Sequence, residues 1–296
     1  MHDENHHHGL AHDLEVLGQM VAERRRALRW LGVGSLAPLG LLACGGGDSA
    51  STTSTSTATG STTTTDTSTS TSTTTGSCGN TTTIASETNG PYPADGTNTL
   101  NGSTVNALTL SGIVRSDIRS SIVSSSTTAD GVLLTVTLTL VNTNSSCAAL
   151  SGYAVYLWHC TRDGLYSMYS SGVTGENYLR GVQVSDSNGS VTFTTIFPGC
   201  YSGRMPHIHF EVYASQTAAT TTPAGDQVRT SQIALPRDVC SAVYATTGYS
   251  ASVANLAAIT FATDNVFSDG TSTELATVTG SASAGYAATL TVGLAV

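Results

Sequence analysis

The residues whose types and spacing could support chemistry gather between positions 194 and 212 of this sequence. His207 and His209 lie two residues apart, and the apolar residues Ile208, Phe210 and Val212 alternate with them. Because successive side chains of a strand point to opposite faces, this alternation predicts a strand with both imidazoles on one face and a core on the other. Two neutral imidazoles side by side supply half of a metal site.

A glycine-rich turn just before this expected strand carries Tyr201 and Arg204. The alternative interpretation is an ordinary strand with two surface histidines. After position 12 the sequence contains only one further histidine, His159. A pair of histidines in a chain otherwise so poor in them favours a functional site.

The turn and the strand together have the pattern Pro-Gly-x-Tyr-x-Gly-Arg-x-x-His-Ile-His-Phe over residues 198–210. This pattern resembles the intradiol ring-cleavage dioxygenases, in particular their exported subgroup. The resemblance spans roughly residues 85–292, because further motifs occur upstream in the family's order. They lie at residues 89–92, 115–119, 157–167 and 179–183.

The resemblance implies a mononuclear non-haem Fe(III) centre whose ligands match one by one. Tyr166 follows an Asp-Gly turn, Tyr201 lies in the Pro-Gly-x-Tyr turn, and His207 and His209 form the histidine pair. Phenolate oxygen is a hard anionic donor and suits a hard trivalent ion. Coordination would hold both tyrosines deprotonated far below their free pKa of about 10.

The implied reaction cleaves a small aromatic diol with O2 between its two hydroxylated carbons and gives a muconate-type diacid. Tyr201 matches the phenolate that the substrate displaces, and Arg204 the arginine that stabilises negative charge developing on the substrate. Gln232 resembles the family's supporting glutamine, although a variable loop precedes it. His159 is interpreted as structural. No motif selects one catechol or larger phenol.

Two other function classes compete with this interpretation. A cupin-type Fe(II) oxygenase would use His207, His209 and a carboxylate, but Glu211 follows too closely and no histidine lies further downstream. An exported, non-catalytic β-sandwich that binds a metal, an aromatic compound or a glycan would not need the full Tyr/Tyr/His/His set with Arg204.

Composition limits the possible partners and the class of fold. All 11 basic residues are arginine and the formal net charge is -9, so nucleic-acid binding is not expected. Thr, Ser, Ala and Gly dominate, which suits an all-β exported domain. The resemblance implies no oligomeric state, because a signal and a tether occupy the place of the helical dimerisation region of cytoplasmic catechol dioxygenases.

The N-terminus is interpreted as a targeting segment. Residues 1–43 combine Arg24, Arg25 and Arg26 with a short apolar run that ends before Cys44, which resembles a twin-arginine signal with a lipoprotein cleavage site. Residues 44–80 are rich in Ser, Thr and Gly and predict a disordered tether. We therefore expect export from a bacterial cytoplasm, and a mature lipoprotein tethered through Cys44 on the periplasmic or cell-surface side.

The domain of residues 81–296 is expected to be a β-sandwich of the intradiol dioxygenase type, with many short strands and glycine-rich turns. The expected strands are 108–114, 132–141, 153–160, 191–197, 208–213 and 288–296. Five cysteines follow Cys44. An oxidising compartment favours disulfides between them, with one thiol left free.

Overall fold

The computed structural model describes residues 81–221 and 225–296. The expected signal segment (1–43), the expected tether (44–80) and the expected lipidation site Cys44 lie outside these residues. In the described part, no helix is long and apolar enough to cross a membrane.

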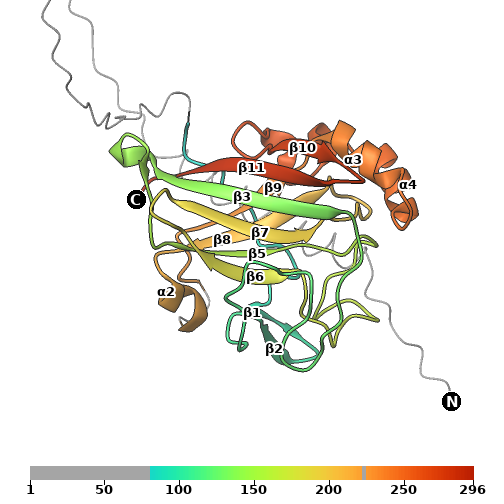
Figure 1. Ribbon diagram of the computed structural model, residues 1–296, viewed down its shortest axis with the longest axis horizontal. Coiled ribbons are helices and arrows are strands. Elements are labelled where there is room, and N and C mark those ends of the chain that lie inside the picture. Colours follow the sequence, from blue (N-terminus) through green and yellow to red (C-terminus); the bar gives the residue numbers. More distant parts are fainter. Residues whose placement is uncertain (1–80, 222–224) are drawn as a thin grey trace, which may run out of the picture. The chain divides into compact units, whose positions relative to one another are not determined.

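Strands make up most of the regular structure of the described part, and its helices are few and short (Figure 1). The strands are β1 (Asp95–Leu100), β2 (Ser103–Asn106), β3 (Leu133–Asn142), β4 (Ala148–Ala149), β5 (Ala154–Trp158), β6 (Arg180–Val184), β7 (Ser190–Ile196), β8 (His207–Tyr213), β9 (Arg229–Ala234), β10 (Thr277–Ser281) and β11 (Gly285–Leu294). The helices are η1 (Thr143–Ser145), α2 (Gln216–Thr221), α3 (Arg237–Tyr244), α4 (Ser250–Ala258), η2 (Phe261–Thr263) and η3 (Phe267–Asp269).

Two sheets form a sandwich. One has the strand order β6-β5-β8-β9, and its neighbouring strands are all antiparallel. The other has the order β10-β11-β3-β4 with β7 also paired to β3, and in it β11 runs parallel to β3. Side chains from both sheets belong to one buried cluster. The hydrophobic core therefore lies between the two layers, and the expectation of an all-β fold is confirmed.

The regular alternation of β3 decides which of its faces meets this core. Its inward side chains Leu134, Val136, Leu138 and Leu140 are at most 1% exposed, whereas the threonines between them are half-buried on the outer face. Burying one such aliphatic side chain stabilises the fold by about 1.5–3 kcal/mol relative to leaving it exposed.

The four-stranded sheet is also covered on its other face. A second buried cluster there combines Tyr156 and Trp158 of β5 with side chains of the 94–113 segment and of the loop that follows β5. Every residue of β8 is consequently buried. His207 and His209 are 2% and 3% exposed, so the interpretation as surface histidines is wrong.

Five of the six expected strands occur, as β3, β5, β7, β8 and β11. The strand expected at 108–114 is wrong. This segment consists of turns, held by hydrogen bonds from the Leu110 N–H to the Ala107 carbonyl and from the Ile113 N–H to the Leu110 carbonyl, each 3.1 Å long. Leu108 and Ile113 are buried in the second cluster, and Val114 forms only an isolated bridge with Val182.

The state of the cysteines differs from the expectation that only one of the five would be a free thiol. Cys160, Cys200 and Cys240 are free and buried. Cys147 is disulfide-bonded, so its partner lies outside the described residues. Burial raises the pKa of both the Cys160 and Cys200 thiols to about 12. These thiols therefore remain protonated in the core and are poor nucleophiles.

Candidate metal centre

Two tyrosines and two histidines converge on the covered face of the four-stranded sheet. His207 and His209 belong to β8, Tyr201 lies in the loop before it, and Tyr166 lies in the loop between β5 and β6. Tyr201 Oη and Tyr166 Oη lie 3.2 and 3.5 Å from His207 Nε2. His209 Nε2 lies 3.0 Å from the same atom. The fold thus brings together all four residues that the sequence nominates as ligands.

The spacing of these four atoms fits a single metal ion. Nitrogen and oxygen ligands bound at about 2.0–2.2 Å and roughly 90–110° apart are separated from each other by about 3 Å. In the part of the chain that the structure describes, no group of three or more His, Cys, Asp and Glu residues could hold a metal. A metal at this place would therefore draw on phenol oxygens beside the two imidazoles.

Glycines allow the two tyrosine-bearing loops to approach each other. A Cβ on Gly199 would lie 2.4 Å from the Arg162 carbonyl oxygen, so no larger residue fits there. Gly164 has φ +83°, and a Cβ on it would lie 3.0 Å from the Tyr201 Cβ. The glycines before Tyr201 and Tyr166 are thus required by close packing and by backbone conformation.

Burial sets the protonation of the four groups. It lowers the pKa of His207 and of His209 well below the usual value, and the nearby positive charge of Arg204 lowers both further. It raises the pKa of Tyr201 to about 12 and that of Tyr166 well above its usual value. The imidazoles are therefore neutral and ready to bind a metal, whereas the phenols would release their protons when a cation binds.

Hydrogen bonding and stacking orient the two imidazoles. His207 Nδ1 lies 2.6 Å from the Met205 carbonyl oxygen. A carbonyl can only accept, so Nδ1 carries the proton and the lone pair of Nε2 faces the other three donor atoms. The His209 ring stacks on Trp158, with centroids 4.9 Å apart and planes within 8°.

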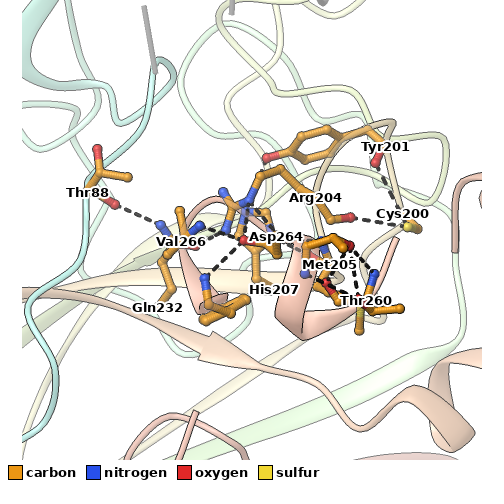
Figure 2. A network of polar contacts seen from close by, with 12 residues as sticks. Thr88, Cys200, Tyr201, Arg204, Met205, His207, Gln232, Thr260, Asp264 and Val266 are labelled. Carbon is orange, nitrogen blue, oxygen red and sulfur yellow. Dashed lines mark hydrogen bonds and ion pairs between the residues drawn. The ribbon is translucent and has the colours of Figure 1, made fainter. Parts of the chain in front are cut away.

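We call the four candidate ligands Tyr166, Tyr201, His207 and His209 the donor cluster. Arg204 lies next to two of them, Tyr201 and His207, and contacts Gln232 (Figure 2). Arg204 Nη2 donates to Gln232 Oε1 at 2.7 Å, and Gln232 Nε2 donates to the Thr88 carbonyl at 2.9 Å. Gln232 pairs with His209 across β8 and β9, which brings it to the site despite the variable loop. Arg204 also forms a buried ion pair with Asp264. No sequence motif pointed to Asp264.

Arg180 is a second residue whose part in the site the sequence did not reveal. Its side chain is 1% exposed. It donates to the carbonyls of Tyr92 and Pro93, which border the site, and to the carbonyl and hydroxyl of Ser167 next to Tyr166. Arg180 thereby ties the segment around Pro93 to the loop that carries a candidate ligand.

Glu211 does not join the donor cluster, although it was the only carboxylate that a cupin-type site could use. Its Oε2 accepts a hydrogen bond of 2.8 Å from the Tyr213 hydroxyl, and the side chain is fully buried. Burial, and then the nearby charge of Asp95, raise the pKa of Glu211 to about 8. In the absence of a metal the carboxyl is therefore mostly protonated at neutral pH, and its hydrogen bonds come from the Tyr213 and Thr230 hydroxyls, not from the four candidate ligands.

This raised pKa predicts a loss of stability at high pH. Between its unfolded pKa of 4.5 and its folded pKa of about 8, Glu211 holds a proton only in the folded protein. The stability that this group contributes below pH 4.5 is therefore lost progressively as the pH rises to about 8. In Glu211→Gln this group no longer titrates. We therefore expect its free energy of unfolding to fall less steeply with pH than that of the parent, by up to about 1.4 kcal/mol per pH unit.

The measurement is urea unfolding of both proteins at pH 6, 7 and 8. Glu176→Gln is the control, because hydrogen bonding, chiefly from Ser121, lowers the pKa of that carboxyl, so it does not titrate in this range. Identical pH slopes for the parent and Glu211→Gln would contradict the assignment of a protonated Glu211.

Comparisons with known proteins agree with the geometry. Residues 119–235 match the family model described as Dioxygenase, and this range contains all six residues that the sequence assigned to the site. No curated protein matches the sequence.

Several solved structures are similar to this chain. An intradiol ring-cleavage dioxygenase from Tetranychus urticae superposes with a TM-score of 0.53 at 23% identity, over 72% of this chain and 95% of that chain. The dioxygenase domain of a carbohydrate-binding fusion from Streptomyces sp. SirexAA-E gives a TM-score of 0.41 at 23% identity, over 68% and 98%. A 3-chlorocatechol 1,2-dioxygenase from Rhodococcus opacus 1CP gives 0.43 at 16% identity, over 71% of each chain.

The first of these superpositions shows that the sandwich has the intradiol dioxygenase fold. The family model independently matches the segment that carries the two tyrosines and the histidine pair. The resemblance to the intradiol ring-cleavage dioxygenases that the sequence motifs indicate is thereby confirmed.

Proposed function

We propose that this protein is a non-haem Fe(III)-dependent dioxygenase that cleaves a catechol-type ring between its two hydroxylated carbons. The observation that carries the proposal is the convergence of two phenol oxygens and two imidazole nitrogens. Tyr166 Oη, Tyr201 Oη and His209 Nε2 all lie 3.0–3.5 Å from His207 Nε2. A ferric ion bound by this set would supply a Lewis-acid centre that makes a bound catechol reactive toward O2.

The charges of the site support a trivalent ion. The buried phenols resist ionisation on their own, because burial raises the pKa of both. A highly charged cation is what would stabilise two phenolates in such a place, and hard oxygen donors favour a hard ion. Two neutral imidazoles complete the set without adding charge.

The two tyrosines have unequal access to substrate. Tyr166 is 2% exposed, whereas Tyr201 is only partly buried. Tyr201 would thus be the metal-binding tyrosine that an incoming catechol can reach. Its Oη, whose pKa burial raises to about 12, is basic enough to take a proton from a catechol hydroxyl beside it.

Arg204 has the chemistry to stabilise charge on a bound substrate. Its guanidinium offers only donors, so it cannot act as a metal ligand. Opposing charges nearby, Tyr201 first among them, raise its pKa even though burial alone lowers it. A permanent cation fixed beside the donor cluster favours negative charge that develops on the ring during attack by oxygen.

The test is incubation of the iron-loaded full chain with catechol and with substituted catechols under O2. We expect one O2 consumed per catechol and a muconate-type diacid as the product. A ring-opened aldehyde would show cleavage outside the two hydroxyls and overturn the intradiol assignment. Binding of catechols without O2 uptake would favour the non-catalytic binding protein.

We also propose that the protein is exported and anchored through a lipid on Cys44. The support is the paired arginines and the Leu-Leu-Ala-Cys sequence in residues 24–44. Mass spectrometry of the native protein decides it: a mature chain that starts at diacylated Cys44 is expected, and an unmodified or different N-terminus rejects it.

A further inference from the structure

The guanidinium of Arg204 is held by Asp264, which lies outside the segment that matches the family model. Arg204 Nε lies 3.2 Å from Oδ1 and 3.1 Å from Oδ2 of Asp264. The two side chains are 4% and 0% exposed. Two opposite charges in so little water interact strongly, and neither is tolerated there without the other.

Asp264 also binds backbone groups on two separate segments. Its Oδ2 accepts a hydrogen bond of 2.6 Å from the Met205 N–H, on the turn before β8. Its Oδ1 accepts from the N–H groups of Val266 at 2.8 Å and Phe267 at 3.1 Å. The Asp264 carboxylate therefore connects the turn before β8, which carries Tyr201 and Arg204, to the segment around η2 and η3 (Figure 2). Each of these bonds is strengthened by the charge of the acceptor.

Other contacts fix the same guanidinium from different sides. Arg204 Cζ lies 5.6 Å from the centroid of the Phe267 ring, a cation–π distance. Arg204 Nη2 donates to Gln232 on β9. Helix η2, which ends just before Asp264, has a reciprocal capping box between Thr260 and Thr263. Gln232 and the segment 264–267 thus hold the guanidinium together.

We propose that Asp264 is a positioning residue for ring cleavage, which acts by fixing the direction in which Arg204 presents its charge to the metal-bound substrate. The inference rests on the proposed function, because Asp264 acts through Arg204. A guanidinium is a rigid planar fork of five N–H groups. Bonds from Nε to Asp264 and from Nη2 to Gln232 fix that plane, and they leave the Nη1 groups out of both interactions.

The first test is Asp264→Asn, which keeps the size of the side chain and one acceptor but removes the charge. We expect kcat for catechol cleavage to fall about 10- to 100-fold, as for other changes that disturb the orientation of a group in a metal site. The KM for catechol and the iron content should stay near the parent values, because Asp264 touches none of the four donor atoms. Glu274→Gln is the matched control: this carboxyl is also buried, at 1% exposure, and forms no ion pair with Arg204, so its kcat should equal that of the parent.

The second test separates positioning from a general structural role. Asp264→Asn is combined with Arg204→Leu, and kcat is measured for both single variants and the double variant. A residue that acts through Arg204 should have no further effect once Arg204 is gone. A merely structural residue should lower kcat by the same factor in both backgrounds, and that result overturns the inference.

A readout independent of activity comes from thermal unfolding. Arg204→Leu leaves the carboxylate of Asp264 buried and unpaired, so we expect the Tm to fall by roughly 10 °C. The double variant Arg204→Leu/Asp264→Asn removes the unpaired charge but keeps an acceptor for the N–H groups of Met205, Val266 and Phe267, so it should recover part of that loss while it stays inactive. Additive Tm changes would show that the two side chains are not coupled and would overturn the inference.

These outcomes distinguish the inference from the proposed function. If the parent cleaves no catechol, the proposed function fails, and the Tm measurements still decide whether the pair acts as one unit. If the parent is active and Asp264→Asn turns over equally fast, the inference alone fails. Should Asp264→Asn not fold, Asp264→Glu takes its place: it keeps the charge but displaces it by one methylene, and parent-like kcat in that variant overturns the inference.

Discussion

Replacing Arg204 by leucine is expected to lower kcat for catechol cleavage by roughly 100- to 1,000-fold while the protein keeps its iron. The guanidinium is not a ligand, and its contacts run to Asp264 and Gln232, not to the donor atoms. Its positive charge matters most when negative charge builds up on the ring. The variant should therefore still bind catechol, still show the visible band of the metal centre and lose turnover.

The measurements are iron content, the spectral change on adding catechol, and O2 consumption, all on the folded fraction of the variant. Arg162→Leu is the control for charge, because it removes one positive charge from a side chain that is 32% exposed and paired with Asp130. Parent-like turnover by Arg204→Leu would show that the assigned role is wrong. Loss of iron would instead make Arg204 a structural support for the turn.

His207→Ala is expected to lose both the metal and the activity. His207 Nε2 is the atom from which Tyr166 Oη, Tyr201 Oη and His209 Nε2 all lie within 3.5 Å. Disturbing a residue that only supports a ligand typically weakens metal affinity about 10- to 100-fold. Removing His207 takes away one ligand of four, so the loss of affinity should be larger than that. Iron stoichiometry after dialysis measures this directly.

His159→Gln is the matched control for His207→Ala. The His159 imidazole is equally buried, but it hydrogen-bonds the Cys160 carbonyl and the Thr195 hydroxyl, away from the donor cluster. It should keep one iron per chain, whatever its effect on stability. If His207→Ala binds iron as well as the parent does, His207 is not a ligand.

The sequence predicted most of this site because its signals are local. The alternation around His207 and His209 defines a strand and its faces, and Tyr201 and Arg204 lie within one short turn of that strand. The strand pattern of β3 was clear for the same reason. Alternating side chains report directly on which face is buried.

The features that the sequence did not reveal are those that depend on contacts between segments far apart in the chain. Asp264 stands alone in a turn-rich segment, and only folding brings its carboxylate to Arg204. Arg180 likewise becomes part of the site through the Tyr92 and Pro93 carbonyls. The apolar residues at 108–114 suggested a strand, but Leu108 and Ile113 are buried by packing onto a second face of the sheet. A local pattern carries no information about such a face.

The most direct test of the four-ligand centre is a titration of the metal-free protein with Fe(III), followed by visible absorption and by the metal bound per chain. We expect one equivalent to bind and to produce a wine-red to purple band from charge transfer between tyrosinate and iron. Tyr166→Phe and Tyr201→Phe should each shift or bleach that band, because each removes one phenolate. A protein that binds one equivalent and stays colourless, or a band that survives both substitutions unchanged, would contradict the assignment of Tyr166, Tyr201, His207 and His209 as the ligands of a ferric centre.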